Sequence, residues 1–84
     1  MSEKNRPTGR QLSAARALAG LDQVEVARRS NISLPTLRRM EASTGEASGM
    51  ANNVAAVQTV LEEAGIEFIP EDGGGLGVRL KKQP

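Results

Sequence analysis

The stretch of sequence that decides the fold is residues 23–41, QVEVARRSNISLPTLRRME. Asp22 and Glu25, at its start, have the spacing of a capping box, in which each residue satisfies a free backbone N–H of the other. This spacing predicts that a helix begins here and buries Val26 on its apolar face. The helix is about two turns long, because the Ser-Asn pair at 30–31 interrupts the apolar pattern.

A second short helix follows directly. Ser33 is a good N-cap residue, and Pro35 falls in the first turn, where its missing N–H has no intrahelical partner to lose. Leu37 and Met40 mark the buried face of this helix, and Ala27 is small at the point where the two helices cross. The stretch therefore predicts two helices joined by a tight turn.

The residues before this pair predict a flexible arm and a first helix. Residues 1–7 show no periodicity and are interpreted as the arm. Thr8 and Gln11 also have capping-box spacing, and Gly20 ends the helix. Its apolar face contains Leu12, Ala15 and Ala19.

A loop and a fourth helix are expected after the second of the short helices. Residues 42–49 are small and polar, without periodicity, and predict the loop. Gly65 is placed as the C-cap of the fourth helix. The apolar positions at helical spacing are Val54, Val57, Val60, Leu61 and Ala64.

The last part of the chain has the period of a β-hairpin. Residues 66–70 and 76–81 alternate between apolar and polar, and residues 71–75 contain an Asp-Gly turn signal. Pairing Phe68 with Val78 gives apolar neighbours on one face. The same register aligns two more pairs, Ile66 with Leu80 and Glu67 with Arg79. We expect the apolar face to lie on the fourth helix.

The two-helix stretch resembles the helix-turn-helix of the lambda-repressor-like (Xre-like) DNA-binding family. The likeness runs from residue 12 to about residue 57 or 61, and includes the pattern Leu12-x-x-x-Arg16-x-x-x-Gly20-Leu21-x-Gln23. Ile32 fills the turn, and Asn31 stands where the family usually has glycine, because the backbone there is left-handed. The expected fold is mainly α, with a four-helix lambda-repressor-like domain at residues 8–65 and a C-terminal β-hairpin at residues 66–84.

The resemblance also implies roles for single residues. In the family pattern Arg16 pairs with Glu41, and a partly buried bidentate pair would clamp the first helix to the end of the third. Gln23 and Ser33, at the starts of the second and third helices, would bind phosphates of the DNA backbone.

The outward side of the third helix is the predicted DNA-reading surface. At about 100° per residue, Leu37, Met40 and Glu41 are committed to the core. The opposite side and its margins hold five candidate base contacts: Leu34, Pro35, Thr36, Arg38 and Arg39. Arginine can donate two hydrogen bonds to guanine, and small apolar groups contact a thymine methyl. Arg28 and Arg29 are candidate phosphate contacts, with a purely solvent-facing position as the alternative.

The charge of the chain is divided unevenly between its two halves. The formal net charge is +1, but residues 1–40 hold eight Lys and Arg against three acids, whereas residues 41–84 hold three against seven. Affinity for nucleic acid of any sequence comes from Lys and Arg near phosphates. The distribution therefore favours a front that faces a polyanion and an acidic back. Lys4 and Arg6 would add to that front if the N-terminal arm reached the DNA.

The composition excludes several classes of function. The 84 residues contain no Cys, no His and no Trp, which removes the common zinc ligands and the thiol and imidazole catalysts. We therefore expect no enzyme, no metal and no cofactor. No run of about 18 apolar residues and no signal-peptide pattern are present, so a cytoplasmic protein without membrane attachment is expected.

The leading hypothesis is a sequence-specific transcriptional regulator, such as a repressor, that binds double-stranded DNA as a homodimer on an inverted-repeat operator. One recognition helix reads only a few base pairs, so discrimination needs two half-sites. RNA polymerase or a regulatory protein is a further candidate partner. The alternative is a protein-interaction module, an antiactivator or antitoxin-like partner, that keeps the helix-turn-helix fold.

Two arrangements of the homodimer are compatible with the pattern. In the first, the hairpin pairs with its copy, because a two-stranded sheet leaves unpaired backbone groups at its edges. The contact residues would be Ile66, Phe68, Val78 and Leu80. In the second, the fourth helices pack together along Val57, Val60 and Leu61.

Overall fold

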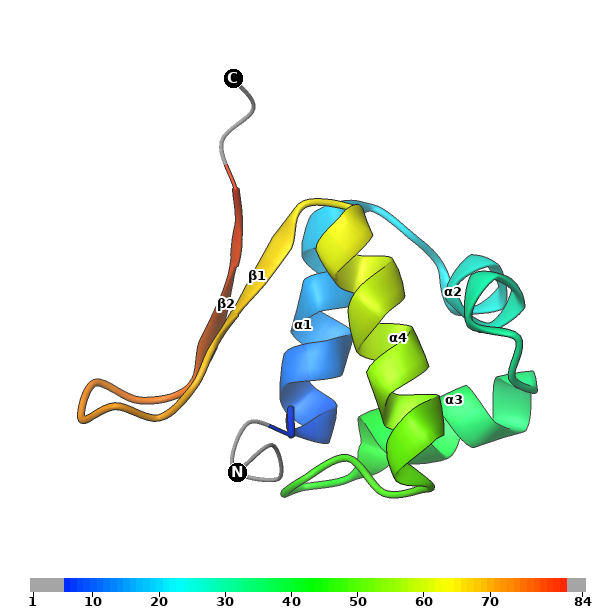
Figure 1. Cartoon of the computed structure of the whole chain (residues 1–84), viewed down its shortest axis with the longest axis horizontal. Helices are drawn as coiled ribbons and strands as arrows, with labels where there is room; N and C mark the ends of the chain where they lie inside the picture. Colours follow the sequence, from blue (N-terminus) through cyan, green and yellow to red (C-terminus); the bar gives the residue numbers. More distant parts are fainter. Residues whose placement is uncertain (1–5, 82–84) are drawn as a thin grey trace.

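Four helices and a hairpin follow one another along the chain, as the sequence predicts (Figure 1). The computed structural model describes residues 6–81. The helices are α1 (Gly9–Ala19), α2 (Gln23–Ser30), α3 (Leu34–Ala42) and α4 (Ala51–Glu63), and the strands are β1 (Ile66–Ile69) and β2 (Gly77–Leu80). The protein is mainly α.

The first three helices begin at side-chain caps. At α1 the predicted capping box is complete, because the Gln11 N–H donates to Thr8 Oγ1 at 3.0 Å and the Thr8 N–H donates to Gln11 Oε1 at 2.9 Å. At α2 only half of the predicted box is present. Asp22 accepts from the Glu25 N–H at 2.8 Å, but the Glu25 carboxylate turns away to two arginines. Ser33 caps α3 by accepting from a backbone N–H.

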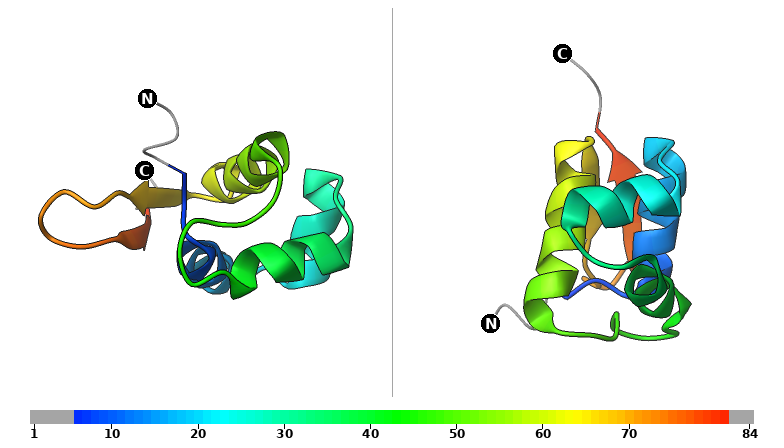
Figure 2. Two further views of the ribbon diagram at one scale, coloured as in Figure 1. Left: turned by 90° about the horizontal axis from the view of Figure 1, so that it is seen from below. Right: turned by 90° about the vertical axis from the view of Figure 1, so that its right-hand side faces the viewer.

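A core of small aliphatic side chains lies between the helices. α1 and α4 lie side by side, and α2 and α3 pack on one side of them (Figures 1 and 2). All four helices, one loop residue and the first residue of β1 contribute to the buried cluster, which contains Leu12, Ala15, Val26, Ala27, Leu37, Met40, Ala47, Val54, Val57, Val60, Leu61 and Ile66. The single aromatic residue, Phe68, packs at its edge.

The hairpin has the predicted register but packs against a different set of helices. Ile66 pairs with Leu80, Glu67 with Arg79 and Phe68 with Val78. The sheet packs against α1 as well as α4, whereas the sequence predicted α4 alone. The reason is Gln11 of α1, whose buried amide group donates to both strands, to the carbonyl oxygens of Ile69 at 3.1 Å and Gly77 at 2.9 Å.

The packing of the hairpin on the helices corrects the predicted list of dimer contacts. Ile66 is only 1% exposed within its own chain, so it cannot touch a second copy. Phe68 and Val78 are half-buried against the core, while Leu80 is 47% exposed. The contact residues expected for the helical arrangement, Val57, Val60 and Leu61, also lie in the core.

The start of the described chain is anchored instead of forming part of a free arm. Pro7 is buried, and its carbonyl oxygen accepts from the Ala47 N–H at 2.9 Å. The Arg6 guanidinium donates to the Ala47 carbonyl oxygen at 2.6 Å. The predicted arm residues 1–5, with Lys4, lie outside the described residues. The loop predicted at 42–49 begins one residue later, because α3 includes Ala42.

Between residues 6 and 81, the longest helix has 13 residues, and none has the length and apolar character that crossing a bilayer requires.

Candidate nucleic-acid interface

The turn between α2 and α3 is fixed by its own backbone. Asn31 has φ 59° and ψ 43°, the left-handed conformation expected of this position, and ends α2. The next N–H, from Ile32, donates back to the Ala27 carbonyl oxygen at 3.1 Å. Ala27 itself is buried where the two helices meet. This turn sets the direction in which α3 leaves α2.

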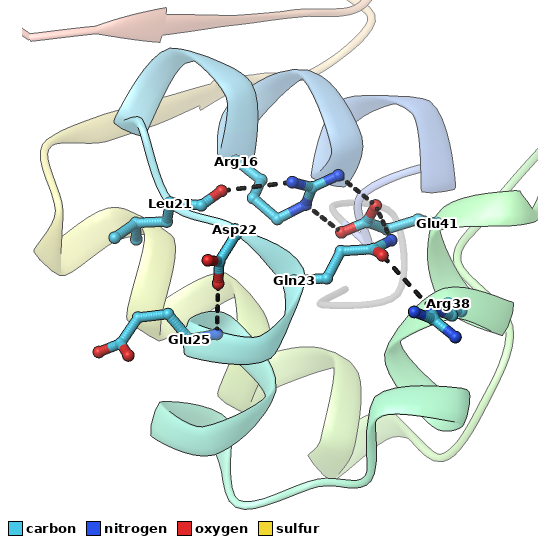
Figure 3. Close-up of polar contacts among 7 residues, drawn as sticks. All are labelled: Arg16, Leu21, Asp22, Gln23, Glu25, Arg38 and Glu41. Atoms are coloured by element: carbon cyan, nitrogen blue, oxygen red, sulfur yellow. Dashed lines mark hydrogen bonds and ion pairs between the residues drawn. The ribbon is translucent and has the colours of Figure 1, made fainter.

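A buried carboxylate joins three helices at the ends of α2 and α3 that lie away from this turn (Figure 3). Arg16 of α1 donates two hydrogen bonds to Glu41 of α3, at 2.8 and 3.0 Å, as the family resemblance implies. The Glu41 side chain is only 7% exposed and also accepts from Gln23 Nε2 of α2 at 3.0 Å. The hydrogen bonds to Glu41 raise the pKa of the Arg16 guanidinium, which keeps it charged. The orientation of α3 against α1 and α2 is therefore held by polar contacts as well as by the core.

Gln23 lies within this cluster instead of pointing freely to solvent. Its amide oxygen accepts from Arg38 Nε at 3.4 Å, while its amide nitrogen is bound to Glu41 (Figure 3). A phosphate only accepts hydrogen bonds, so the predicted contact through this side chain has to come from Nε2, which already donates to Glu41. The backbone N–H of Gln23, in the first turn of α2, has no partner within the helix.

The outward side of α3 carries most of the predicted base contacts. Pro35, Arg38 and Arg39 are exposed, and Thr36 is half-exposed. Leu34, expected at the margin of this face, is half-buried, like Thr36, and also packs against the core. It sits in the first turn of α3, at the margin of the outward face, where the neighbouring core is close enough to cover it. The face therefore presents two guanidinium groups beside a proline and a threonine methyl.

Ser33 marks the exposed beginning of this face. Its Oγ accepts from the Thr36 N–H at 3.2 Å and shares a hydrogen bond with Thr36 Oγ1 at 2.8 Å. The residue is exposed, so an oxygen of a bound phosphate can reach it without a change in the helix.

Arg28 and Arg29 are exposed but already paired. Both donate to the same carboxylate, Glu25 on the preceding turn of α2, at 2.5 and 2.6 Å. The hydrogen bonds from Arg28 and then Arg29 hold the pKa of Glu25 below its ordinary value. The three residues together carry one positive charge, so the phosphate attraction of α2 is weaker than its two arginines suggest.

Arg10 is an exposed basic residue near α3 that the sequence reasoning did not select. It lies in the first turn of α1 and lines a hollow of about 510 Å³ whose other wall is the C-terminal end of α3, with Ala42 and Ser43. The start of α1 lies against the end of α3 at Gly9, and the Gly9 N–H donates to the carbonyl oxygen of Gly45, in the loop that follows α3, at 3.0 Å. The uneven distribution of charge along the chain pointed to such residues, but periodicity alone could not place this one beside α3.

The comparisons with known proteins add no further constraint. No protein-family model matches the chain, and a search of curated proteins returned no match.

Proposed function

We propose that this protein is a sequence-specific transcriptional regulator of the lambda-repressor-like type, which binds double-stranded DNA as a homodimer at an inverted-repeat operator. One observation carries the proposal. The outward face of α3 exposes Arg38 and Arg39, and the same helix is held rigidly by the buried pair of Arg16 and Glu41 on its other side. A helix-turn-helix that serves only to hold a fold together needs the buried pair but not the two exposed arginines.

In this proposal α3 enters the major groove with its outward face toward the base edges. Arg39 donates two hydrogen bonds to guanine O6 and N7, and the Pro35 ring or the Thr36 methyl group contacts a thymine methyl. Arg38 leans toward Gln23 in the free protein and contacts a base or a phosphate on the DNA.

Phosphate contacts on either side of α3 set its docking angle. Ser33 and the first backbone N–H groups of α2 bind one strand of the DNA backbone, where the partial positive charge of a helix N-terminus favours a phosphate. Arg28 and Arg29 reach the backbone by exchanging Glu25 for phosphate. Arg10 adds a positive charge at the opposite end of α3. These contacts give affinity for any sequence, and the outward face of α3 gives the choice among sequences.

The test begins with the operator. Genomic fragments retained by the purified protein at a stated salt concentration supply the bound sequence, and a scrambled duplex serves as reference. Arg39→Ala should weaken operator binding by about 1–3 kcal/mol and relax the preference at one position of each half-site. Glu63→Gln, which removes an exposed charge at the end of α4, away from α3 and from β2, is the control.

The two duplexes decide the role of Arg39. Ser33→Ala should weaken both duplexes about equally, because it removes a phosphate contact. Equal losses on both duplexes for Arg39→Ala would remove its base-reading role, and an Arg39→Ala variant with unchanged operator affinity would contradict the proposed docking.

One observation favours the alternative, a protein-interaction module. The end of α4 and the hairpin carry a group of exposed acidic residues on the side away from α3, namely Glu62, Glu63, Glu67, Glu71 and Asp72. Such a surface fits a basic protein partner. Retention on heparin with elution by salt, lost in an Arg38→Ala and Arg39→Ala double variant, favours the regulator; no retention favours the interaction module.

A further inference from the structure

The outer edge of β2 is a strand edge that the protein leaves open. Lys81 donates to the Gly65 carbonyl oxygen at 2.8 Å across the ladder. The N–H and C=O groups of successive residues in a strand point to opposite edges, so every second residue faces the same edge. The backbone groups of Gly77 and Arg79 therefore face β1, like those of Lys81. Those of Val78 and Leu80 point the other way, where no strand lies among the described residues.

Exposed apolar side chains gather along the same edge. The described residues contain five large hydrophobic side chains that are exposed, and two of them, Leu76 at 52% and Leu80 at 47%, flank or end β2. A third, Leu18, is 46% exposed and lies on α1. A groove of about 350 Å³ runs between α1 and β2, lined by Ala14, Leu76 and Val78 among others.

Leu18 does not line this groove but lies beyond its far end, by its place on α1. It follows Gln11 by seven residues, which is about two turns, so both side chains leave the helix on the same side. Gln11 is bound to the start of β2 at Gly77. α1 and β2 run in the same direction (Figure 1), and seven helical residues advance about as far as the three strand residues from Gly77 to Leu80, roughly 10 Å. Leu18 and Leu80 therefore lie at the same level, beyond the far end of the groove.

The sequence along β2 is complementary to itself. Residues 76–80 read Leu-Gly-Val-Arg-Leu, with apolar residues at the first, third and fifth positions, which share one face. In an antiparallel pair centred on Val78, each Leu76 lies opposite the Leu80 of the other copy. Each Arg79 lies opposite a glycine, Gly77, which leaves room for the long side chain.

Neighbouring registers are less favourable. A pair centred on Arg79 places two arginines directly opposite each other, and like charges in that position are destabilising. A pair centred on Gly77 moves Leu80 opposite Gly74, in the turn, and leaves this leucine uncovered. Only the Val78 register matches every apolar residue and separates the charges.

We propose that β2 pairs with β2 of a second copy of this chain, antiparallel and centred on Val78, and that α1 covers the joint with Leu18. The two hairpins then form one four-stranded sheet. An interface of standard size covers about 800 Å² on each partner, roughly 15% of the 5257 Å² surface, which is more than strand pairing alone supplies. The exposed side of α1, with Ala14 and Leu18, provides the remainder.

This interface deepens the homodimer of the proposed function but stands on separate observations. The sheet lies on the opposite side of α1 and α4 from α2 and α3 (Figures 1 and 2), so pairing there leaves both α3 helices free for DNA. The experiments below use no DNA, so failure of the interface and failure of DNA binding are distinguished.

The first test is the mass of the full chain in solution, measured by sedimentation or light scattering at about 100 µM. We expect twice the 8.9 kDa of a single chain. Leu80→Glu and Leu76→Glu, both at exposed positions, should halve that mass while the circular dichroism spectrum is unchanged. Met50→Glu changes the most exposed of the five hydrophobic residues, away from the hairpin, and should leave the mass at the dimer value. A monomeric parent chain, or a dimer that survives both hairpin variants, would overturn the proposal.

The second test fixes the register, and it is clean because the chain has no cysteine of its own. In the Val78 register two copies of residue 78 face each other at a Cα separation of about 5.5 Å, within disulfide range, whereas two copies of residue 79 are diagonal, at about 7–8 Å. Val78→Cys should therefore give a covalent dimer under mild oxidation at least tenfold faster than Arg79→Cys. The reverse order would overturn this register, and a Met50→Cys variant that crosslinks as fast as Val78→Cys would mean that the crosslinks come from random collisions.

Discussion

Glu41 is the residue on which the arrangement of the first three helices depends most. Its buried carboxylate accepts two hydrogen bonds from Arg16 and one from Gln23. Removing it leaves the Arg16 guanidinium partly buried without its partner, which costs far more than losing an exposed charge. The pair therefore fixes the position of α3 from the side opposite its exposed arginines.

Glu41→Ala should lower the free energy of unfolding by about 3–5 kcal/mol. Glu46→Ala, at an exposed position only five residues away, is the matched control and should change it by less than about 0.5 kcal/mol. Thermal and urea unfolding of the two variants beside the parent chain decide the point. Equal melting temperatures for the two variants would show that the buried pair contributes nothing to stability.

Gly9 is a second residue with a large effect, and the reason is space. A Cβ at this position would lie 2.5 Å from the Ser43 carbonyl oxygen and closer still to the Met40 carbonyl oxygen. Both obstacles are backbone atoms at the end of α3, so no side chain can turn aside to make room.

Gly9→Ala should therefore lower the free energy of unfolding by about 3 kcal/mol, although alanine is the better helix former. Gly45→Ala, where an added Cβ meets no atom within 4 Å, is the control and should leave stability close to that of the parent chain. Urea unfolding measures both. A Gly9→Ala variant as stable as Gly45→Ala would mean that α1 and α3 can separate at little cost.

Single residues differ in how well the sequence predicts them. The caps at Thr8 and Ser33 follow from local spacing, because the side chain bonds a backbone group three residues away. The close approach at Gly9 depends on α3, more than thirty residues along the chain, and no local pattern reports it. The contact of Leu34 with the core is likewise not visible in the sequence, since it depends on neighbours outside its own helix.

At the scale of elements, Glu25 lowers the net positive charge that α2 presents to solvent. This carboxylate holds Arg28 and Arg29 along the helix. Their hydrogen bonds hold the pKa of Glu25 below its ordinary value of 4.5, so the cluster persists at neutral pH. A carboxylate whose pKa is lower in the folded state stabilises the fold at any pH above its unfolded pKa, about 4.5. This stabilisation by Glu25 is lost as the pH falls from about 4.5 through the folded pKa.

Glu25→Gln should strengthen binding to operator and scrambled duplexes alike, because it removes a negative charge near the phosphates and releases two arginines. The gain should shrink as the salt concentration rises, because it is electrostatic. Glu67→Gln, which releases Arg79 on the hairpin, is the matched control and should leave the affinity for both duplexes unchanged. Fluorescence anisotropy across a salt series checks this. An affinity that is unchanged in Glu25→Gln would place α2 away from the DNA backbone.

The helices and the hairpin could be predicted because their periods differ. Apolar residues recur every three or four positions in α4 and every second position in the hairpin, and strand pairing then fixes the register. The docking of the hairpin on α1 could not be predicted. Gln11 looks like a polar helix-cap residue in the sequence, and its bonds to Ile69 and Gly77 span 58 and 66 residues.

At the scale of the whole molecule, the division of charge along the chain corresponds to a division in space. The exposed arginines of α2 and α3 lie on one side of the molecule, and the acidic end of α4 and the hairpin turn lie toward the other (Figure 1). The sequence predicted this polarity because each half of the chain forms adjacent elements. It is the arrangement that a DNA-binding front and an association surface at the back require, and both roles rest on the fold staying in one piece.

The hairpin should prove necessary for that fold. Ile66, 1% exposed, fills the core between α1 and α4, and the Gln11 amide has its two interstrand partners only when the hairpin is present. A chain ending at Gly65 exposes the apolar core and also the side of α1 that the hairpin covers in the full chain. Losing one buried isoleucine alone costs about 2–5 kcal/mol, a large part of what a domain of this size can supply. We expect the truncated chain to lose its cooperative melting transition in circular dichroism, whereas Leu80→Glu in the full chain keeps it. A truncated chain that melts cooperatively at the parent temperature would show instead that the four helices fold alone and that the hairpin serves association only.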